Sequence, residues 1–166
     1  MRHPVPKIHV LVLCKGNICR SPLLEGLLQH RTAISNLSLS YHFDSAGTSA
    51  FHRAEPPDSR SIEVAARAGL SIGDQRSRPI TLDDLGQFDF IVAMDRANRR
   101  FVTELGAFPD ERLLLARHFD PTSSEHDVPD PWYGAPGGFE EVFAMLERAT
   151  APLLDHFATL GARPRP

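Results

Sequence analysis

The sequence predicts a single α/β domain in which a mostly parallel sheet carries helices on both faces. Residues 8–13 form an almost unbroken aliphatic stretch, which is typical of a strand buried on both faces. Leucines at helical spacing follow this stretch, and further apolar runs at 88–94 and 112–116 alternate with helical patterns. The chain has 166 residues, a length that suits one domain with a substantial core.

Local sequence signals set the bounds of the other elements. Asp58 is a suitable N-cap for a helix that Gly69 ends, and Pro152 is expected to kink or divide the last helix near Arg148. We expect helices at residues 21–33, 58–69, 95–105 and 139–160, a short helical turn at 81–84, and an edge strand at 39–43 followed by a turn at 44–48.

Two kinds of irregular segment remain. Residues 119–138 form a long loop rich in Pro, Asp and Ser, and loops of that length in compact domains are usually functional. The ends of the domain, residues 1–6 and 161–166, are expected to fray.

Composition narrows the range of functions. The net charge is −3, from 18 basic and 21 acidic residues, which argues against a nucleic-acid partner. Two cysteines are too few for a disulfide framework or a zinc site, and the eight histidines lack ligand spacing, so we expect no metal and no cofactor. We also expect no membrane insertion, and the lack of a signal-peptide core favours the cytoplasm.

The stretch Cys14-Lys15-Gly16-Asn17-Ile18-Cys19-Arg20-Ser21-Pro22 joins the first strand to the first helix. Unpaired N–H groups at a helix start bind anions, and Gly16 and Asn17 readily accept the positive φ that curls such a loop inward. Arg20 adds a planar fork for two phosphate oxygens, and Ser21 can donate its hydroxyl to the Cys14 sulfur. These groups favour a Cys14 thiolate facing a tetrahedral oxyanion, which is a phosphate-transferring nucleophile. The expected phosphate-binding residues are Lys15, Gly16, Asn17, Ile18, Cys19, Arg20 and Ser21.

A thiolate displaces an alkoxide or phenoxide only if an acid protonates the leaving oxygen. Asp130 is the best candidate because two prolines stiffen its backbone and two aromatic residues follow closely; the alternative is a solvated loop aspartate. Trp132 and Tyr133, with Phe51 opposite, are expected to form the walls of a substrate cleft, although packing of the long loop would also explain them.

The stretch from Cys14 to Pro22 resembles the signature of the low-molecular-weight protein tyrosine phosphatases. Three further motifs similar to that family occur in the family's order, at residues 44–48, 88–95 and 130–134, and extend the resemblance over nearly the whole chain. The resemblance implies a four-stranded parallel sheet with the strand order 2-1-3-4. It also implies that Asp130 is the general acid and that Ser45 supports the loop by a hydrogen bond to Asn17, rather than being a simple turn serine.

The sequence departs from the family pattern at three positions. Lys15 stands where the family more often has a small or apolar residue, and we expect it at the rim of the site. Gln75 replaces a histidine that often follows the second helix, which puts the polar network behind the loop in doubt. Trp132 replaces the first of two aromatic residues, often tyrosine, so that Tyr133 alone could be phosphorylated there.

We therefore expect a cysteine-dependent protein tyrosine phosphatase in which Cys14 is the nucleophile, Arg20 holds the phosphate and Asp130 is the acid. A phosphotyrosine-containing protein or a small aryl phosphate is the expected substrate, and a cognate tyrosine kinase is a candidate partner. Cys19 is expected to be the redox partner that forms a reversible disulfide with Cys14, unless it merely packs.

Three alternative functions depend on specific residues. An arsenate reductase on a similar scaffold needs further cysteines downstream, and none follows Cys19. In the protein-arginine phosphatases, which this sequence also resembles, a threonine stands at the position of Ile18, and Ile18 therefore argues against that activity. A non-catalytic phosphoprotein-binding module would not need Cys14, Arg20 and Asp130 together.

Overall fold

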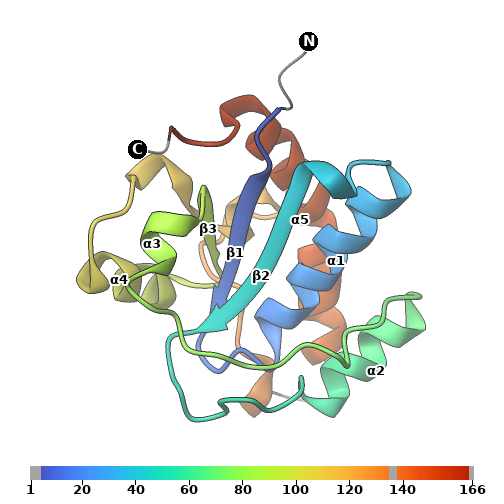
Figure 1. Cartoon of the computed structure of the whole chain (residues 1–166). Helices are drawn as coiled ribbons and strands as arrows, with labels where there is room; N and C mark the ends of the chain where they lie inside the picture. Colours follow the sequence, from blue (N-terminus) through green and yellow to red (C-terminus); the bar gives the residue numbers. More distant parts are fainter. Residues whose placement is uncertain (1–4, 135–137, 165–166) are drawn as a thin grey trace.

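The computed structural model describes residues 5–134 and 138–164, which form a sheet with helices on both faces (Figure 1). The sheet has four strands in the order β2-β1-β3-β4, and all of its pairings are parallel, as the sequence predicts. The strands are β1 (Ile8–Cys14), β2 (Tyr41–Gly47), β3 (Phe90–Ala93) and β4 (Leu113–Leu115).

The central strand β1 is buried on both faces because alternate residues enter two separate cores. Val10 and Val12 join the core beneath α1, α2 and α5, whereas Leu11 and Leu13 join the core beneath α3 and α4. Figure 1 shows these two helical layers on opposite sides of the sheet. The helices are α1 (Arg20–Ile34), α2 (Ser59–Arg67), α3 (Asp84–Gln87), α4 (Arg96–Leu105) and α5 (Gly138–Leu160). No helix within the described ranges is long and apolar enough to cross a bilayer.

Strand β2 runs further than its sequence pattern predicts. The predicted edge strand is present, but its predicted bounds, 39–43, and the predicted turn at 44–48 are wrong, because Leu39 lies in a 3-10 turn and the strand continues to Gly47. Main-chain pairing with β1 is unbroken from Ile8 with Tyr41 to Cys14 with Gly47. The partner strand therefore overrides the weak strand propensity of the polar and glycine residues in this half of β2.

The C-terminal segment is more regular than expected. Helix α5 is continuous through Pro152, because Leu146 and Leu153 on either side of the proline are fully buried in the same core. The expectation that residues 161–166 fray is wrong for 161–163: Arg112 Nη1 donates to Gly161 O at 2.7 Å, and Arg163 N donates to an Asp89 carboxylate oxygen at 2.9 Å. Residues 1–4 and 165–166, where fraying is also expected, lie outside the described residues.

Candidate active site

Cys14 is the last residue of β1, and α1 begins at Arg20, so the predicted phosphate loop spans the carboxyl edge of the sheet. Residues just beyond β2 hold the first half of this loop. Thr48 N donates to Cys14 O at 2.9 Å, and Ser49 N donates to Lys15 O at 3.0 Å. The loop backbone is therefore fixed by hydrogen bonds from the segment after β2 as well as by β1 and α1 at its two ends.

Asn17 adopts a left-handed backbone with φ 57°, as the curl of the loop requires. Its side-chain amide donates to Ser21 Oγ at 2.8 Å and to Ser45 Oγ at 3.0 Å, and its carbonyl accepts from Arg78 N at 3.1 Å. The predicted hydrogen bond to Ser45 is present. No local pattern predicts the contact with Arg78, because it joins residues far apart in the chain.

Gln75, which stands where the family often has a histidine, contacts the helix that follows the loop. Gln75 Nε2 donates to Pro22 O at 3.1 Å, which ties its segment to the first turn of α1. Ser77, two residues on, donates to Gly16 O at 3.1 Å and so holds the outer side of the loop. The support of the loop is therefore made of hydroxyl, amide and backbone groups.

The Cys14 sulfur lies at the floor of the loop and is almost inaccessible, with the whole residue 2% exposed. Asn17 N donates to Sγ at 3.2 Å, and Ser21 Oγ lies 3.0 Å from it. Ser21 Oγ already accepts from the Asn17 amide, so its own hydrogen is available for the sulfur. Both contacts stabilise negative charge on the sulfur.

Arg20 is buried beside Cys14 with its guanidinium held by two groups. Nη1 donates to Asp95 Oδ2 at 2.7 Å and to Val128 O at 2.9 Å. Burial opposes the charged form, but negative charge on the Cys14 sulfur and on the Asp95 and Asp130 carboxylates outweighs it and raises the pKa of Arg20. Sequence analysis missed Asp95, although its position directly after a buried strand was a usable signal, since parallel strands bring their carboxyl ends together.

Asp130 lies across the pocket from the loop. It caps the 3-10 turn Pro131–Tyr133, where its Oδ1 accepts from Trp132 N at 3.1 Å. Its other oxygen, Oδ2, lies 3.7 Å from Arg20 Nη2. The carboxyl group is thus oriented by its own turn and held close to the phosphate-binding guanidinium.

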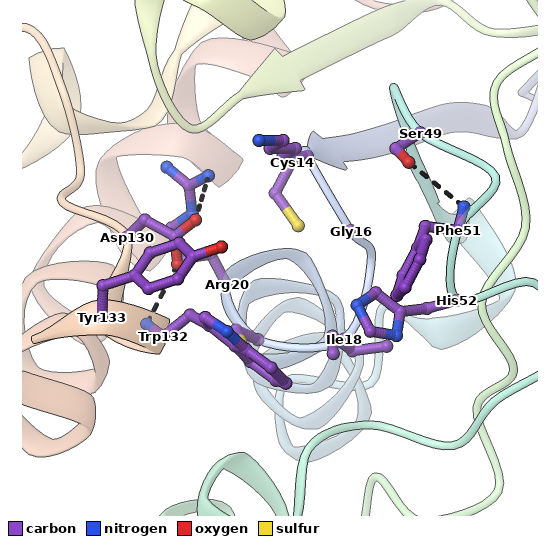
Figure 2. A pocket seen from close by; sticks show the side chains of 12 residues that line it. Cys14, Gly16, Ile18, Arg20, Ser49, Phe51, His52, Asp130, Trp132 and Tyr133 are labelled. Carbon is purple, nitrogen blue, oxygen red and sulfur yellow. Dashed lines mark hydrogen bonds and ion pairs between the residues drawn. The ribbon is translucent and has the colours of Figure 1, made fainter.

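Figure 2 shows the Cys14 sulfur pointing into a pocket with two walls. Trp132 and Tyr133 stand with Asp130 on one side, and Phe51 stands on the other. The cavity has a volume of about 370 Å³, which is the size of a small-ligand site. The residues predicted to form the cleft therefore lie together around the thiol.

His52 is a further wall residue that sequence analysis missed. Its ring centroid lies 5.7 Å from that of Trp132, and its Nδ1 lies 2.7 Å from Glu55 Oε2. No motif marks this histidine in the sequence. It reaches the pocket because it follows Phe51 in the loop that supports Lys15.

The remaining loop residues occupy the floor and the rim. Ile18 and Cys19 are buried and line the pocket, whereas Lys15 lines it from an exposed position, as expected for a rim residue. Burial, and then the nearby Asp58 carboxylate, raise the pKa of the Cys19 thiol. Among the residues that the structure describes, no group of three or more His, Cys, Asp or Glu side chains could hold a metal ion.

A buried thiol at the floor of an anion-binding loop, a guanidinium beside it and a carboxyl group across the pocket form the site of a protein that transfers phosphoryl groups through cysteine. Residues 9–163 match the model of the family described as low molecular weight phosphotyrosine protein phosphatase. The chain belongs to this family.

Individual relatives agree with this assignment. The chain is 37% identical over 150 residues to low molecular weight protein-tyrosine phosphatase A of Mycobacterium tuberculosis, covering 89% of this chain and 90% of that protein. The crystal structure of YfkJ from Bacillus subtilis aligns with a TM-score of 0.87 at 31% identity, over 95% of this chain and 99% of that one. The structure of a Drosophila arginine phosphatase aligns with a TM-score of 0.80 at 27% identity, over 89% and 96% of the two chains.

Proposed function

We propose that the protein is a protein tyrosine phosphatase that works through a cysteinyl-phosphate intermediate. The observation that carries the proposal is the arrangement of three groups in one pocket: the Cys14 sulfur at its floor, with the Arg20 guanidinium and the Asp130 carboxyl group beside it. The family membership and the names of the relatives support the same activity.

The reaction has two steps. Cys14 Sγ attacks phosphorus in line, the P–O bond to the tyrosine breaks, and Asp130 gives its proton to the leaving phenoxide. Water then attacks the phosphocysteine, Asp130 takes a proton from that water, and the S–P bond breaks to release inorganic phosphate and the thiolate. Arg20 and the loop amides hold the equatorial oxygens in both steps, so catalysis depends mainly on positioning and electrostatics.

Phosphotyrosine fits this pocket better than a shorter phosphoamino acid. The thiol lies at the bottom of a cleft with aromatic side chains on both walls, and a phenyl phosphate reaches further than a seryl phosphate. Ile18 at the floor gives an apolar contact at the position where arginine phosphatases have a threonine, which favours an aromatic substrate. Turnover of phosphotyrosine, phosphoserine and phosphoarginine peptides, compared at equal concentrations, decides between these substrates.

Partners and location extend the proposal. Phosphotyrosine proteins are the proposed substrates, and Tyr133, which is 85% exposed at the pocket mouth, is the proposed target of a cognate tyrosine kinase. We propose a cytoplasmic location, in keeping with two cysteines that are both free.

Two substitutions test the mechanism. Cys14→Ser should abolish turnover while phosphate still binds, because the amides and Arg20 remain. Asp130→Ala should reduce turnover about a hundred- to ten-thousand-fold on substrates with poor leaving groups, and much less on activated aryl phosphates, which leave without a proton. Asp110→Ala, at an exposed aspartate paired with Arg99, is the matched control. Equal losses on both substrate types in Asp130→Ala would remove Asp130 from the role of acid.

A further inference from the structure

Lysine is scarce in this protein, and one of its lysines lies at the proposed active site. Of 18 basic residues, Lys7 and Lys15 are the lysines, and the other basic residues are arginines. Lys15 directly follows the nucleophile Cys14, and it lines the same pocket while being exposed to solvent. Neither the proposed chemistry nor the support of the loop uses its ammonium group.

The backbone of Lys15 is fixed although its side chain is exposed. Lys15 O accepts from Ser49 N at 3.0 Å, and a Cβ atom at Gly47 would come within 2.7 Å of the same oxygen. This close packing allows the main chain little movement. The ammonium group is therefore presented from a defined point on the rim, and within residues 5–134 and 138–164 no carboxylate hydrogen-bonds or pairs with it.

Two carboxylates that follow the wall residue His52 in the chain have polar partners of their own. Glu55 lies 2.7 Å from His52 Nδ1, and Asp58 lies 3.0 Å from Arg60 Nε. Arg53, which directly follows His52 in the chain, is exposed and likewise has no carboxylate partner in the described part of the chain. Lys15 and Arg53 are therefore two exposed cations near this side of the pocket that have no carboxylate partner within the described ranges.

We propose that Lys15 is a specificity-determining residue that binds a carboxylate of the substrate, so that the enzyme prefers phosphotyrosine next to an acidic residue. The inference rests on the proposed phosphatase function. When the phosphate lies over Cys14, the peptide main chain must cross the pocket mouth, because the loop floor has room for the phosphoryl group and the walls hold the ring. The side chains that flank the phosphotyrosine then lie at the rim, where Lys15 is exposed.

The expected preference is moderate and depends on salt. Exposed ion pairs contribute up to a factor of about five to an equilibrium, so we expect an acidic flank to raise kcat/KM about two- to fivefold. Screening shortens the range of exposed charges from about 10 Å at 0.1 M salt to about 3 Å at 1 M. The preference should therefore decrease steeply as the salt concentration rises.

The experiment compares kcat/KM for two phosphotyrosine peptides that differ only in having Glu or Gln beside the phosphotyrosine. The variants are Lys15→Gln, Lys15→Glu and, as the matched control, Lys7→Gln. Lys7 precedes β1 and Lys15 follows it, so the two lysines lie at opposite ends of a seven-residue strand, roughly 26 Å apart along the chain direction. Both Gln substitutions change the net charge equally, which separates a local contact from the overall field of the protein.

We expect the wild-type protein and Lys7→Gln to prefer the Glu peptide about two- to fivefold at low salt, Lys15→Gln to show no preference, and Lys15→Glu to prefer the Gln peptide. An equal loss of preference in Lys7→Gln, or an unchanged preference in Lys15→Gln, would overturn the inference. The inference would also be overturned if Lys15 favoured a carboxylate on a small phenyl phosphate but did not favour the Glu peptide over the Gln peptide. If neither peptide is hydrolysed while phosphoarginine is, the proposed function itself fails. If the wild-type protein hydrolyses both peptides equally well, only the role of Lys15 is refuted and the proposed function stands.

Discussion

Glu25 should make the stability of the folded protein depend on pH near neutrality. It lies in α1 behind the phosphate loop and is 6% exposed. Gln29 Nε2 donates to its Oε2 at 3.2 Å, and the Ser45 side chain is a further polar neighbour. Burial raises the pKa of Glu25 from 4.5 to about 7, with a further contribution from Asp44, whereas the hydrogen bonds and the Arg78 charge oppose the rise.

The direction and size of the effect follow from the two pKa values. Below pH 4.5 the carboxyl group is protonated in both the folded and the unfolded chain, and its contribution to stability is fully present. Between pH 4.5 and about 7 the unfolded chain loses the proton while the folded chain keeps it, so stability falls as the pH rises. The interval is about 2.5 pH units, and at about 1.36 kcal/mol per unit the total loss is about 3 kcal/mol.

Glu25→Gln tests this reasoning because it keeps the shape and hydrogen bonding of a protonated carboxyl group. We expect urea unfolding from pH 4.5 to 8.5 to show the wild-type protein losing about 3 kcal/mol relative to this variant. Glu63→Gln, at an exposed ion pair of α2, is the control and should follow the wild-type profile. Parallel profiles for the wild-type protein and Glu25→Gln would refute the raised pKa.

Two more predictions concern the pocket. Peroxide should inactivate the protein reversibly through a Cys14–Cys19 disulfide, with Cys19→Ser recovering less completely on addition of thiol; equal recovery would show that Cys19 merely packs. Because the pKa of Cys19 is raised, disulfide closure should accelerate as the pH rises, which the rate of disulfide formation after brief peroxide exposure measures. Trp132→Ala should lower kcat/KM for phosphotyrosine peptides about two- to tenfold while inhibition by inorganic phosphate barely changes. If phosphate inhibition weakens in parallel, Trp132 supports the loop instead of contacting the ring.

Those parts of the site that are local in sequence could be predicted, and those that depend on strand neighbours could not. The strand, loop and helix around Cys14 have strong local signals, and Arg20 and Asn17 lie where the loop needs them. The local pattern predicts Asp95 as the start of a helix, which it does cap by accepting from Asn98 N. Its second role, holding Arg20, exists because β1 and β3 are adjacent.

The errors in the fold have the same origin. The polar half of β2 has poor strand propensity, and only its pairing along the whole of β1 makes it a strand. Pro152 does not divide α5, because the core contacts on both sides of it hold the helix together. The hydrogen bond from Arg163 to Asp89 joins two segments far apart in sequence, which no local pattern could reveal.

The partners of Arg20 have a consequence for how the protein refolds. Although the phosphate loop is a short segment, its guanidinium bonds to Asp95, 75 residues away, and to Val128, 108 residues away. Closing such long loops costs conformational entropy before the contact stabilises the fold, and local contacts do not bear this cost. Helix content and collapse can therefore return while Arg20 is still misoriented. Recovery of enzyme activity is accordingly a stricter measure of native structure here than recovery of secondary structure.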